Sequence, residues 1–297
     1  MSGCSAWGCS NRPENGSKLF RFPTNPHRRK TWEAKVNSFT GRRTPITNFA
    51  MVRSQLLDRK MTSVSNNIYA TLCNGKQIPL LGLGTFQSTS DDVKEVIKTA
   101  VGIGYRHIDT ARAYRNETEI GGAIKELIDT GVIKRTDIFV TTKLRGTFHR
   151  PENVEHALKL SLEALQLEYV DLYLMHSPMA LEYRGDDAFW PTREDGTLAH
   201  DDIHFVETWK AMEPLVTKGL TKSIGVSNFN GQQPSEILKI NRIPCVMNQI
   251  ENHPFLDQKE LIDLCKSNDV MVTSYSPLGA PDRPTRKLGV NNIQMYE

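Results

Sequence analysis

The chain has 297 residues, a length that fits one large α/β domain or one domain with a small appendage. Apolar residues make up 38% and charged residues 24%, which excludes a collagen-like, disordered or disulfide-dense chain. No window approaches the roughly 18 consecutive apolar residues that span a bilayer, and the first residues lack the apolar run of a secretory signal. The five cysteines are scattered and do not form a disulfide framework. We therefore expect a cytoplasmic protein with reduced thiols.

The net charge of +3 conceals two segments of opposite sign. Residues 1–60 carry 12 Lys and Arg against 3 Asp and Glu, whereas the remaining residues carry 25 against 31. The first segment has only Trp32, Val36 and Phe39 as a short apolar face, too little for a core of its own. We divide the chain accordingly into a basic segment, 1–60, expected to be poorly ordered, and a folded domain, 61–297.

From Ile78 onward, short apolar runs alternate with segments of helical period. Seven runs begin at Ile78, His107, Ile138, Asp171, Lys222, Pro244 and Val270. Between the first two, Val93, Val96, Ile97, Ala100 and Val101 keep the spacing of a helix with one buried stripe. This alternation predicts βα units around a parallel sheet, and seven strands fit a (β/α)8 TIM barrel better than an open sheet.

An eighth strand does not follow in the sequence. After Pro284 the chain reads TRKLGVNNIQMYE, too short for a helix, a strand and another helix. We therefore expect a barrel that lacks its last strand and helices, with two parallel edges left uncovered.

Nearly every predicted strand ends in polar residues. In chain order these are Asp109 with Tyr114, Lys143, His176, Ser227 with Asn228, Gln249, and Tyr275 with Ser276. Because the carboxyl ends of barrel strands share one mouth, these side chains are expected to form a ring there. Each residue alone also has a structural interpretation, as a turn cap, a solvated lysine or a core histidine, but four reactive groups at successive strand ends favour a site.

A carboxylate, an ammonium, a phenol and an imidazole together suggest proton donation to a carbonyl oxygen. A free tyrosine has a pKa near 10 and needs a neighbouring cation to become a useful acid, which Lys143 would supply while Asp109 keeps the lysine charged. His176 would then orient the substrate oxygen. Since no nucleophile or metal cluster competes, reduction by an external hydride is the most economical chemistry.

These segments resemble the aldo-keto reductases over residues from about 70–78 to 284. GYRHIDTARAYRNETEIGGAI carries Asp109 and Tyr114, VDLYLMHSP carries His176, and VMNQIENHPFLDQKELIDLCK and VTSYSPLGAPDRP continue the pattern. The resemblance implies an NADPH-dependent oxidoreductase that reduces aldehydes or ketones to alcohols, with Tyr114 as proton donor. It implies that Lys143 lowers the pKa of Tyr114, that Asp109 steadies Lys143, and that His176 binds the carbonyl oxygen.

The same resemblance implies a cofactor site. Ser227, Asn228 and Gln249 would hold the nicotinamide carboxamide and Tyr275 would stack on the ring, with Thr85, Ser276, Leu278 and Asp282 along the cofactor. GLGTF at Gly82 lacks the third glycine and acidic partner of a Rossmann fingerprint, so that interpretation is disfavoured.

Three departures from the family pattern concern substrate and cofactor. Phe86 stands where many relatives have a tryptophan lining the substrate pocket, and Ser177 stands where a bulky aromatic is frequent, which predicts a wider pocket. The Lys and Arg that grip the adenosine 2′-phosphate would follow Pro284 and are absent. The physiological substrate, the preference between NADP and NAD, and the oligomeric state stay open.

Residues 1–45 resemble the start of a THAP-type zinc finger that binds DNA. Cys4 and Cys9 lie in MSGCSAWGCSNR, LFRFP follows, and Trp32 is in the expected place. The later Cys-x-x-His that would complete a tetrahedral zinc site is absent, so the two cysteines form at most an incomplete site. A disordered cationic tail, with weak nonspecific contact to DNA phosphates, is the simpler interpretation.

Three hypotheses follow from these observations. The first is an NADPH-dependent carbonyl reductase acting on a small-molecule aldehyde or ketone. The second is a catalytically impaired barrel fused to a DNA- or zinc-binding segment, for which a nuclear location would apply. The third is a truncated or chimeric gene model, in which Met61 would be the natural initiator of the reductase.

Overall fold

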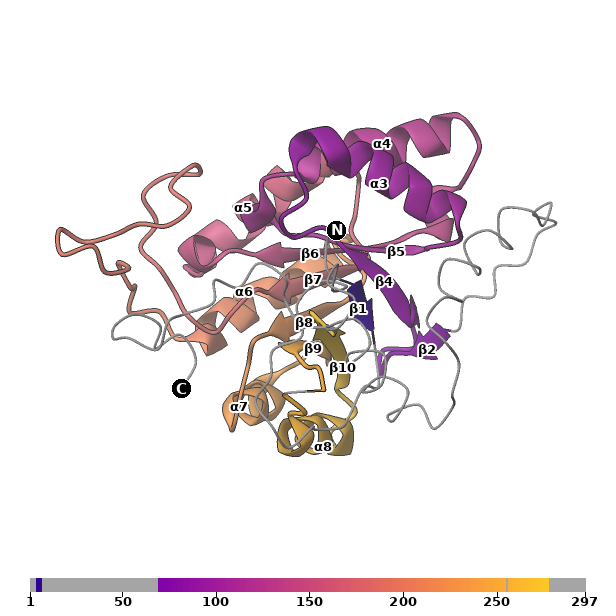
Figure 1. The fold of residues 1–297 in the computed structure, drawn as a ribbon. Helices are drawn as coiled ribbons and strands as arrows, with labels where there is room; N and C mark the ends of the chain where they lie inside the picture. Colours follow the sequence, from indigo (N-terminus) through magenta and orange to yellow (C-terminus); the bar gives the residue numbers. More distant parts are fainter. Residues whose placement is uncertain (1–3, 7–68, 255, 278–297) are drawn as a thin grey trace, which may run out of the picture. The chain divides into compact units, whose positions relative to one another are not determined.

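The computed structural model describes residues 4–6, 69–254 and 256–277, and within them the chain forms an α/β barrel (Figure 1). Seven strands pair side by side and parallel in sequence order. They are β4 (Leu81–Gly84), β5 (His107–Asp109), β6 (Phe139–Leu144), β7 (Leu172–Met175), β8 (Ile224–Ser227), β9 (Cys245–Glu251) and β10 (Met271–Tyr275). The seven predicted strands are confirmed, and the described residues contain no eighth parallel strand.

A short strand, β1 (Cys4–Ala6), lies between the two ends of the parallel sheet. It runs antiparallel to both neighbours, with Cys4 opposite Leu83 of β4 and Ala6 opposite Ser274 of β10. The prediction that both edges stay uncovered is therefore wrong at these positions. Backbone N–H and C=O groups at a sheet edge need partners, and three residues of the basic segment supply some of them here.

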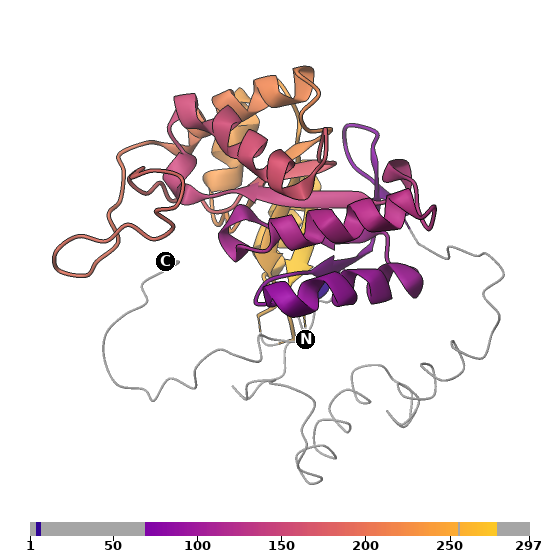
Figure 2. The same ribbon diagram turned by 90° about the horizontal axis from the view of Figure 1, so that it is seen from above.

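Helices follow the strands and cover the outside of the barrel (Figure 2). They are α3 (Ser90–Gly102), α4 (Glu117–Asp129), α5 (Pro151–Leu165), α6 (Phe205–Thr217), α7 (Gln233–Ile240) and α8 (Lys259–Ser267). In α3 the predicted stripe is buried at Val93, Ile97, Ala100 and Val101, while Val96 is only partly buried. The Thr89 hydroxyl accepts a hydrogen bond from the Asp92 amide and caps this helix. No helix in the described part of the chain is long and apolar enough to cross a membrane.

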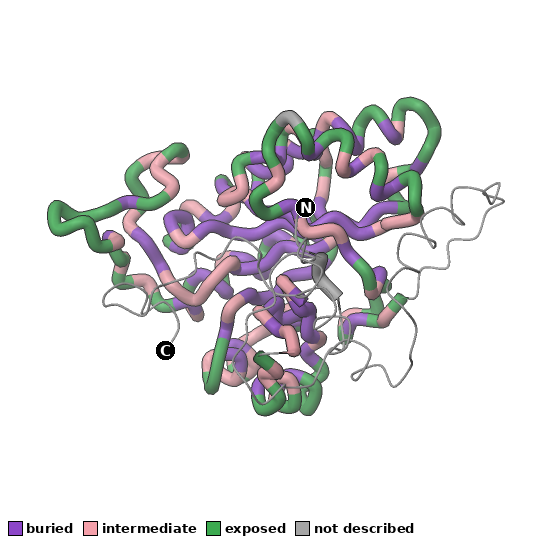
Figure 3. The backbone as a smooth tube through the Cα atoms, in the orientation of Figure 1, coloured by how far each residue is buried: buried purple, intermediate pink, exposed green. Residues whose placement is uncertain are grey.

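Apolar side chains pack in two layers, one on each side of the strands. Tyr173 and Met175 of β7 belong to the layer under the helices, whereas Leu172 and Leu174 point into the barrel, as alternation along a strand requires. The strands are accordingly buried almost throughout (Figure 3).

A hairpin closes the end of the barrel where the strands begin. Its strands are β2 (Tyr69–Thr71) and β3 (Gln77–Pro79), paired antiparallel. Leu72 and Ile78 pack against the first residues of β6, β7 and β9. With this end filled by apolar side chains, the opposite end, where the strands finish, is the one left for polar groups.

Helices α4 and α5 lie close together at Gly121. A Cβ at this position would lie 2.5 Å from the carbonyl oxygen of Leu165, and backbone cannot move aside cheaply. We expect Gly121→Ala to lower the free energy of unfolding by about 1–3 kcal/mol through overpacking. Urea denaturation of the purified chain measures this change.

The neighbouring glycine provides the matched control. A Cβ at Gly122 would meet only the end of the Lys94 side chain, at 3.8 Å. Because alanine is the better helix former, Gly122→Ala should leave stability unchanged or raise it by up to about 1 kcal/mol. Equal effects of the two substitutions would contradict the close approach of α4 to α5.

Candidate active site

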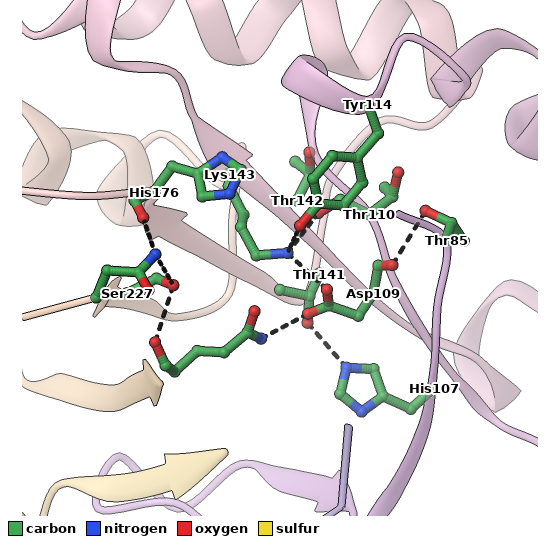
Figure 4. A network of polar contacts seen from close by, with 12 residues as sticks. Thr85, His107, Asp109, Thr110, Tyr114, Thr141, Thr142, Lys143, His176 and Ser227 are labelled. Carbon is green, nitrogen blue, oxygen red and sulfur yellow. Dashed lines mark hydrogen bonds and ion pairs between the residues drawn. The ribbon is translucent and has the colours of Figure 1, made fainter. Parts of the chain in front are cut away.

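The ammonium group of Lys143 lies at the centre of the mouth of the barrel. Lys143 is the penultimate residue of β6, and its side chain is completely buried. Its Nζ atom lies 2.5 Å from Oδ1 of Asp109, at the end of β5, and donates to the Thr110 carbonyl at 2.9 Å. It also lies 3.3 Å from the Tyr114 hydroxyl (Figure 4). The parallel pairing of β5 with β6 brings these groups together.

Tyr114 ends a single turn of 3-10 helix, η1 (Arg112–Tyr114), that follows β5. Its ring meets the His176 ring edge-on, with centroids 5.6 Å apart, and the Phe86 ring at 5.1 Å. His176 directly follows β7 and is partly exposed, while Phe86 is 55% exposed. The four residues singled out for proton transfer therefore share one site, and Phe86 borders it.

A second set of polar side chains extends the site toward β8, β9 and β10. Gln249 of β9 donates from Nε2 to the other oxygen of Asp109 at 2.7 Å, and Ser227 donates to the Gln249 carbonyl at 2.9 Å. The Asn228 amide donates to the His176 carbonyl at 2.8 Å and accepts from the Tyr275 hydroxyl at 2.7 Å. A continuous hydrogen-bonded path thus joins the strand ends from β5 to β10.

The remaining predicted residues fall into two groups. Thr85 is buried and donates to the Asp109 carbonyl at 3.2 Å, and Ser276 follows β10 in the left-handed region, with φ +48°. Leu278 and Asp282 lie outside the described residues, as do Cys9 and most of the segment that resembles a zinc finger. Within the described part of the chain, no three His, Cys, Asp or Glu side chains gather as a metal site.

A family model described as "Aldo/keto reductase family" matches residues 80–293. The chain belongs to the aldo/keto reductase family. The resemblance seen in the sequence and the barrel expected from it are thereby confirmed. The match does not include residues 1–79, and nothing in it supports the zinc-finger resemblance or DNA binding.

Individual relatives agree with the family. The chain is 51% identical over 216 residues to aldo-keto reductase family 1 member A1 from Gallus gallus, which covers 72% of this chain and 65% of that protein. The Xenopus tropicalis protein of the same name is 50% identical over 221 residues, covering 74% and 67%. The solved structure of the aldose reductase from Schistosoma japonicum superimposes with a TM-score of 0.68 at 43% identity, covering 70% of this chain and 68% of that one. The chain thus spans about two thirds of these relatives.

In the candidate site of this aldo/keto reductase, burial and pairing with nearby groups have opposite effects on the pKa values of Lys143 and Tyr114. Burial alone would lower the pKa of Lys143, yet the Asp109 carboxylate and Tyr114 raise it above its usual value, so the ammonium stays charged. Burial raises the pKa of Tyr114, and the charge and hydrogen bond of Lys143 act against that rise. Lys143 thus acts on the pKa of Tyr114 in the expected direction, but burial outweighs its effect, and the phenol keeps its proton at neutral pH.

His176 faces the same cation without a compensating carboxylate. Burial, the charge of Lys143 and His149 lower its pKa to about 3. The imidazole is therefore neutral at physiological pH, with one nitrogen able to donate and the other to accept.

Several side chains of the site escaped the sequence analysis. Glu117 is buried beneath the mouth, where Oε1 accepts from Thr142 at 2.6 Å and Oε2 has no hydrogen-bond partner within the described ranges. Burial raises the pKa of this carboxyl. Arg112 and Arg115 flank Tyr114, and Arg145 follows β6. The sequence could have indicated these arginines only through their position, because they lie close to Tyr114 and Lys143, which had been chosen at the ends of the same strands.

Two buried histidines predict how stability depends on pH. Burial lowers the pKa of His107 and of His149 to about 4 each. As the pH falls from the ordinary histidine pKa of about 6.5 toward 4, the unfolded chain takes up protons that the folded chain does not, so stability is lost in that window. The upper limit is about 3 kcal/mol for each histidine at pH 4. Urea unfolding between pH 7 and 4 measures the loss.

The substitution His149→Leu removes one of these titrations and leaves those of His107 and His176. It breaks no hydrogen bond among the described residues, because neither ring nitrogen of His149 has a partner there. The variant should show a shallower loss of stability between pH 6.5 and 4. His200 is exposed, so His200→Leu should keep the slope of the unmodified chain. A slope unaltered in His149→Leu would contradict the assignment.

Proposed function

We propose that this chain reduces aldehydes or ketones to alcohols, with NADPH as the hydride donor and Tyr114 as the proton donor. One observation carries the proposal: a fully buried Lys143 ammonium is held between the Asp109 carboxylate and the Tyr114 hydroxyl. A phenol beside a fixed cation is suited to giving up its proton exactly when a neighbouring atom gains negative charge. Membership of the aldo/keto reductase family supports the same chemistry.

The proton moves from the Tyr114 hydroxyl to the carbonyl oxygen of the substrate. In the resting site the raised pKa keeps the phenol protonated, the form that a reduction requires. When the proton leaves, the new phenolate faces the Lys143 ammonium, whose Nζ atom lies 3.3 Å from the Tyr114 oxygen, and this positive charge stabilises it. Asp109 keeps that ammonium charged throughout, so the site is organised before the reaction begins.

His176 is assigned to orient the carbonyl oxygen. Its ring packs edge-on against the Tyr114 ring, and its carbonyl is held by the Asn228 amide. A neutral imidazole donates a hydrogen bond to the oxygen without competing with Tyr114 for the role of acid, since its pKa is about 3. Phe86, exposed beside Tyr114, is assigned to contact the substrate.

The polar groups at the ends of β8 and β9 fit a nicotinamide carboxamide. Ser227, Asn228 and Gln249 present a hydroxyl and two amides, which match a group that both donates and accepts hydrogen bonds. Tyr275, Thr85 and Ser276, with Leu278 and Asp282 beyond the described residues, are assigned to the rest of the cofactor. When bound there, NADPH supplies the hydride for the carbonyl carbon.

Removing the phenol hydroxyl tests the proposal directly. Tyr114→Phe should lower kcat for a generic aldehyde by about 10²–10⁴-fold, the usual worth of a general acid, because no other group within reach supplies the proton. NADPH binding should persist, since the proposal gives Tyr114 no part in holding the cofactor. The readouts are the oxidation of NADPH in the presence of aldehyde and the quenching of protein fluorescence by NADPH.

Tyr183→Phe is the matched control. Tyr183 is exposed and hydrogen-bonds Asp186, so the same atom is removed outside the proposed machinery. Undiminished reduction in Tyr114→Phe would rule out this tyrosine as the acid. Absence of NADPH oxidation by the unmodified chain would rule out the activity itself.

A further inference from the structure

A pocket of about 380 Å3 opens beside η1. Its lining residues are Arg112, Arg115, Glu117, Thr118, Asp187 and Phe189. They come from η1, the start of α4 and the loop after β7, all of which follow the carboxyl ends of strands. The pocket therefore lies at the same end of the barrel as Lys143, although none of its lining residues has been assigned above to proton transfer, to the substrate or to the cofactor.

Two arginines hold Phe189 in place. The guanidinium carbon of Arg115 lies 4.0 Å from the centre of the Phe189 ring, and that of Arg145 lies 3.9 Å from it. Arg145 also donates to the Asp186 carbonyl at 2.8 Å, which fixes this part of the loop. An aromatic face attracts a cation but does not neutralise it, so both guanidinium groups keep their positive charge.

The arginines have no ionic partners in the described part of the chain. None of Arg112, Arg115 and Arg145 lies within 4.0 Å of a carboxylate oxygen there. Nε of Arg112 and Nη1 of Arg145 are buried and have no hydrogen-bond partner among the residues that the structure describes, and Arg145 is only 2% exposed. A buried charged donor without an acceptor is costly, and an anion entering from the pocket would relieve that cost.

The carboxylates nearby are mostly engaged elsewhere. Asp186 accepts from the Tyr183 hydroxyl at 2.8 Å and pairs with His156 at 3.0 Å. Glu117 accepts from Thr142 on the inner side of the pocket. The pocket is therefore lined by its two arginines together with Glu117, whose Oε2 atom has no hydrogen-bond partner among the described residues, and with Asp187 on the exposed rim.

The charges around Arg145 affect its pKa. Burial is the largest of the effects that lower its pKa, to about 10, and the repulsion by Arg112 and Arg115 lowers it further. The attraction of Asp186 and Asp187 acts in the opposite direction and is smaller than this repulsion. Among the charged neighbours of Arg145, the effect of the two arginines therefore exceeds that of the two aspartates.

Arg115 is the C-cap residue of η1, with φ +58° in the left-handed region that favours glycine. Six other non-glycine residues in the described part of the chain also have a positive φ, so this conformation by itself marks no site. The Arg115 guanidinium group lies over Phe189 at the edge of the pocket.

We propose that Arg112 and Arg115, with Arg145 packed on Phe189 behind them, form a binding site for a small oxyanion, a carboxylate or phosphate group, at the mouth of the barrel. Guanidinium groups match both oxyanions with paired hydrogen bonds. Tyr114 belongs to the same turn as Arg112 and immediately precedes Arg115, so the oxyanion is assigned to the far end of a carbonyl substrate. This second step rests on the proposed function, whereas anion binding itself does not.

Anion binding is tested without turnover. Thermal unfolding is followed with increasing inorganic phosphate or acetate at constant ionic strength, since a ligand bound to the folded state raises Tm. Both anions should raise Tm in the unmodified chain and in Arg193→Gln, which removes an exposed arginine from the same loop. The rise should disappear in Arg115→Gln and in Arg112→Gln. Equal rises in all four proteins would overturn the site.

The assignment to substrate is tested with two aldehydes of one shape, 4-carboxybenzaldehyde and methyl 4-formylbenzoate. Arg115→Gln should raise KM for the carboxylate by about tenfold and leave KM for the ester unchanged, since only the first presents an oxyanion. The dissociation constant of NADPH should stay unchanged.

The possible failures are distinguishable. Equal changes in KM for the two aldehydes, or a weakened NADPH complex with no change for the carboxylate, would overturn the assignment to substrate. If neither aldehyde is reduced by the unmodified chain, the proposed function fails, and the Tm measurements still decide whether the anion site exists.

Discussion

The buried ion pair of Lys143 with Asp109 is the constraint on which the rest of the site depends. An ammonium group inside a barrel is stable only where its charge is matched and its protons are accepted. Asp109 supplies the charge and Thr110 a carbonyl, and the second oxygen of Asp109 is held by Gln249 from across the mouth. Loss of any of these partners leaves a charged or polar group buried without compensation.

This constraint links distant parts of the chain. Asp109 ends the second of the seven parallel strands, and Gln249 lies in the sixth, 140 residues later. The barrel brings Asp109 and Gln249 together because its strands are parallel and finish at one end. The hairpin β2–β3 and the apolar interior fill the other end. Fold and site are thus stabilised by the same closure.

The mouth holds two kinds of cation, and the difference between them indicates two tasks. Lys143 is neutralised within the protein, so its charge is available only to a group that forms beside it during a reaction. Arg112, Arg115 and Arg145 form no ion pair in the described part of the chain, and Arg115 and Arg145 pack on the Phe189 ring. The charge of Arg112 and Arg115, which line the pocket, remains available to an anion that arrives from outside. Both sets meet at η1, a single turn with Tyr114 at its end.

The sequence by itself determined the barrel and the identity of the central residues. The apolar runs became the seven strands, the stripe from Val93 to Val101 became a buried helix face, and Asp109, Tyr114, Lys143 and His176 could be chosen because polar residues ended successive runs. Periodicity records which face of an element is buried, and chain order places parallel strands in sequence.

Only the tertiary structure decided how those residues act on one another. Burial outweighs the charge of Lys143 and raises the pKa of Tyr114, a balance of two opposing effects that residue types do not reveal. The packing of Arg115 and Arg145 on Phe189, like the pairing of β1 between β4 and β10, joins segments whose separation along the chain carries no signal of contact. The burial of a group and its distance from other charges are defined only in the folded chain. Together they decide whether the pKa of each group at the mouth is raised or lowered.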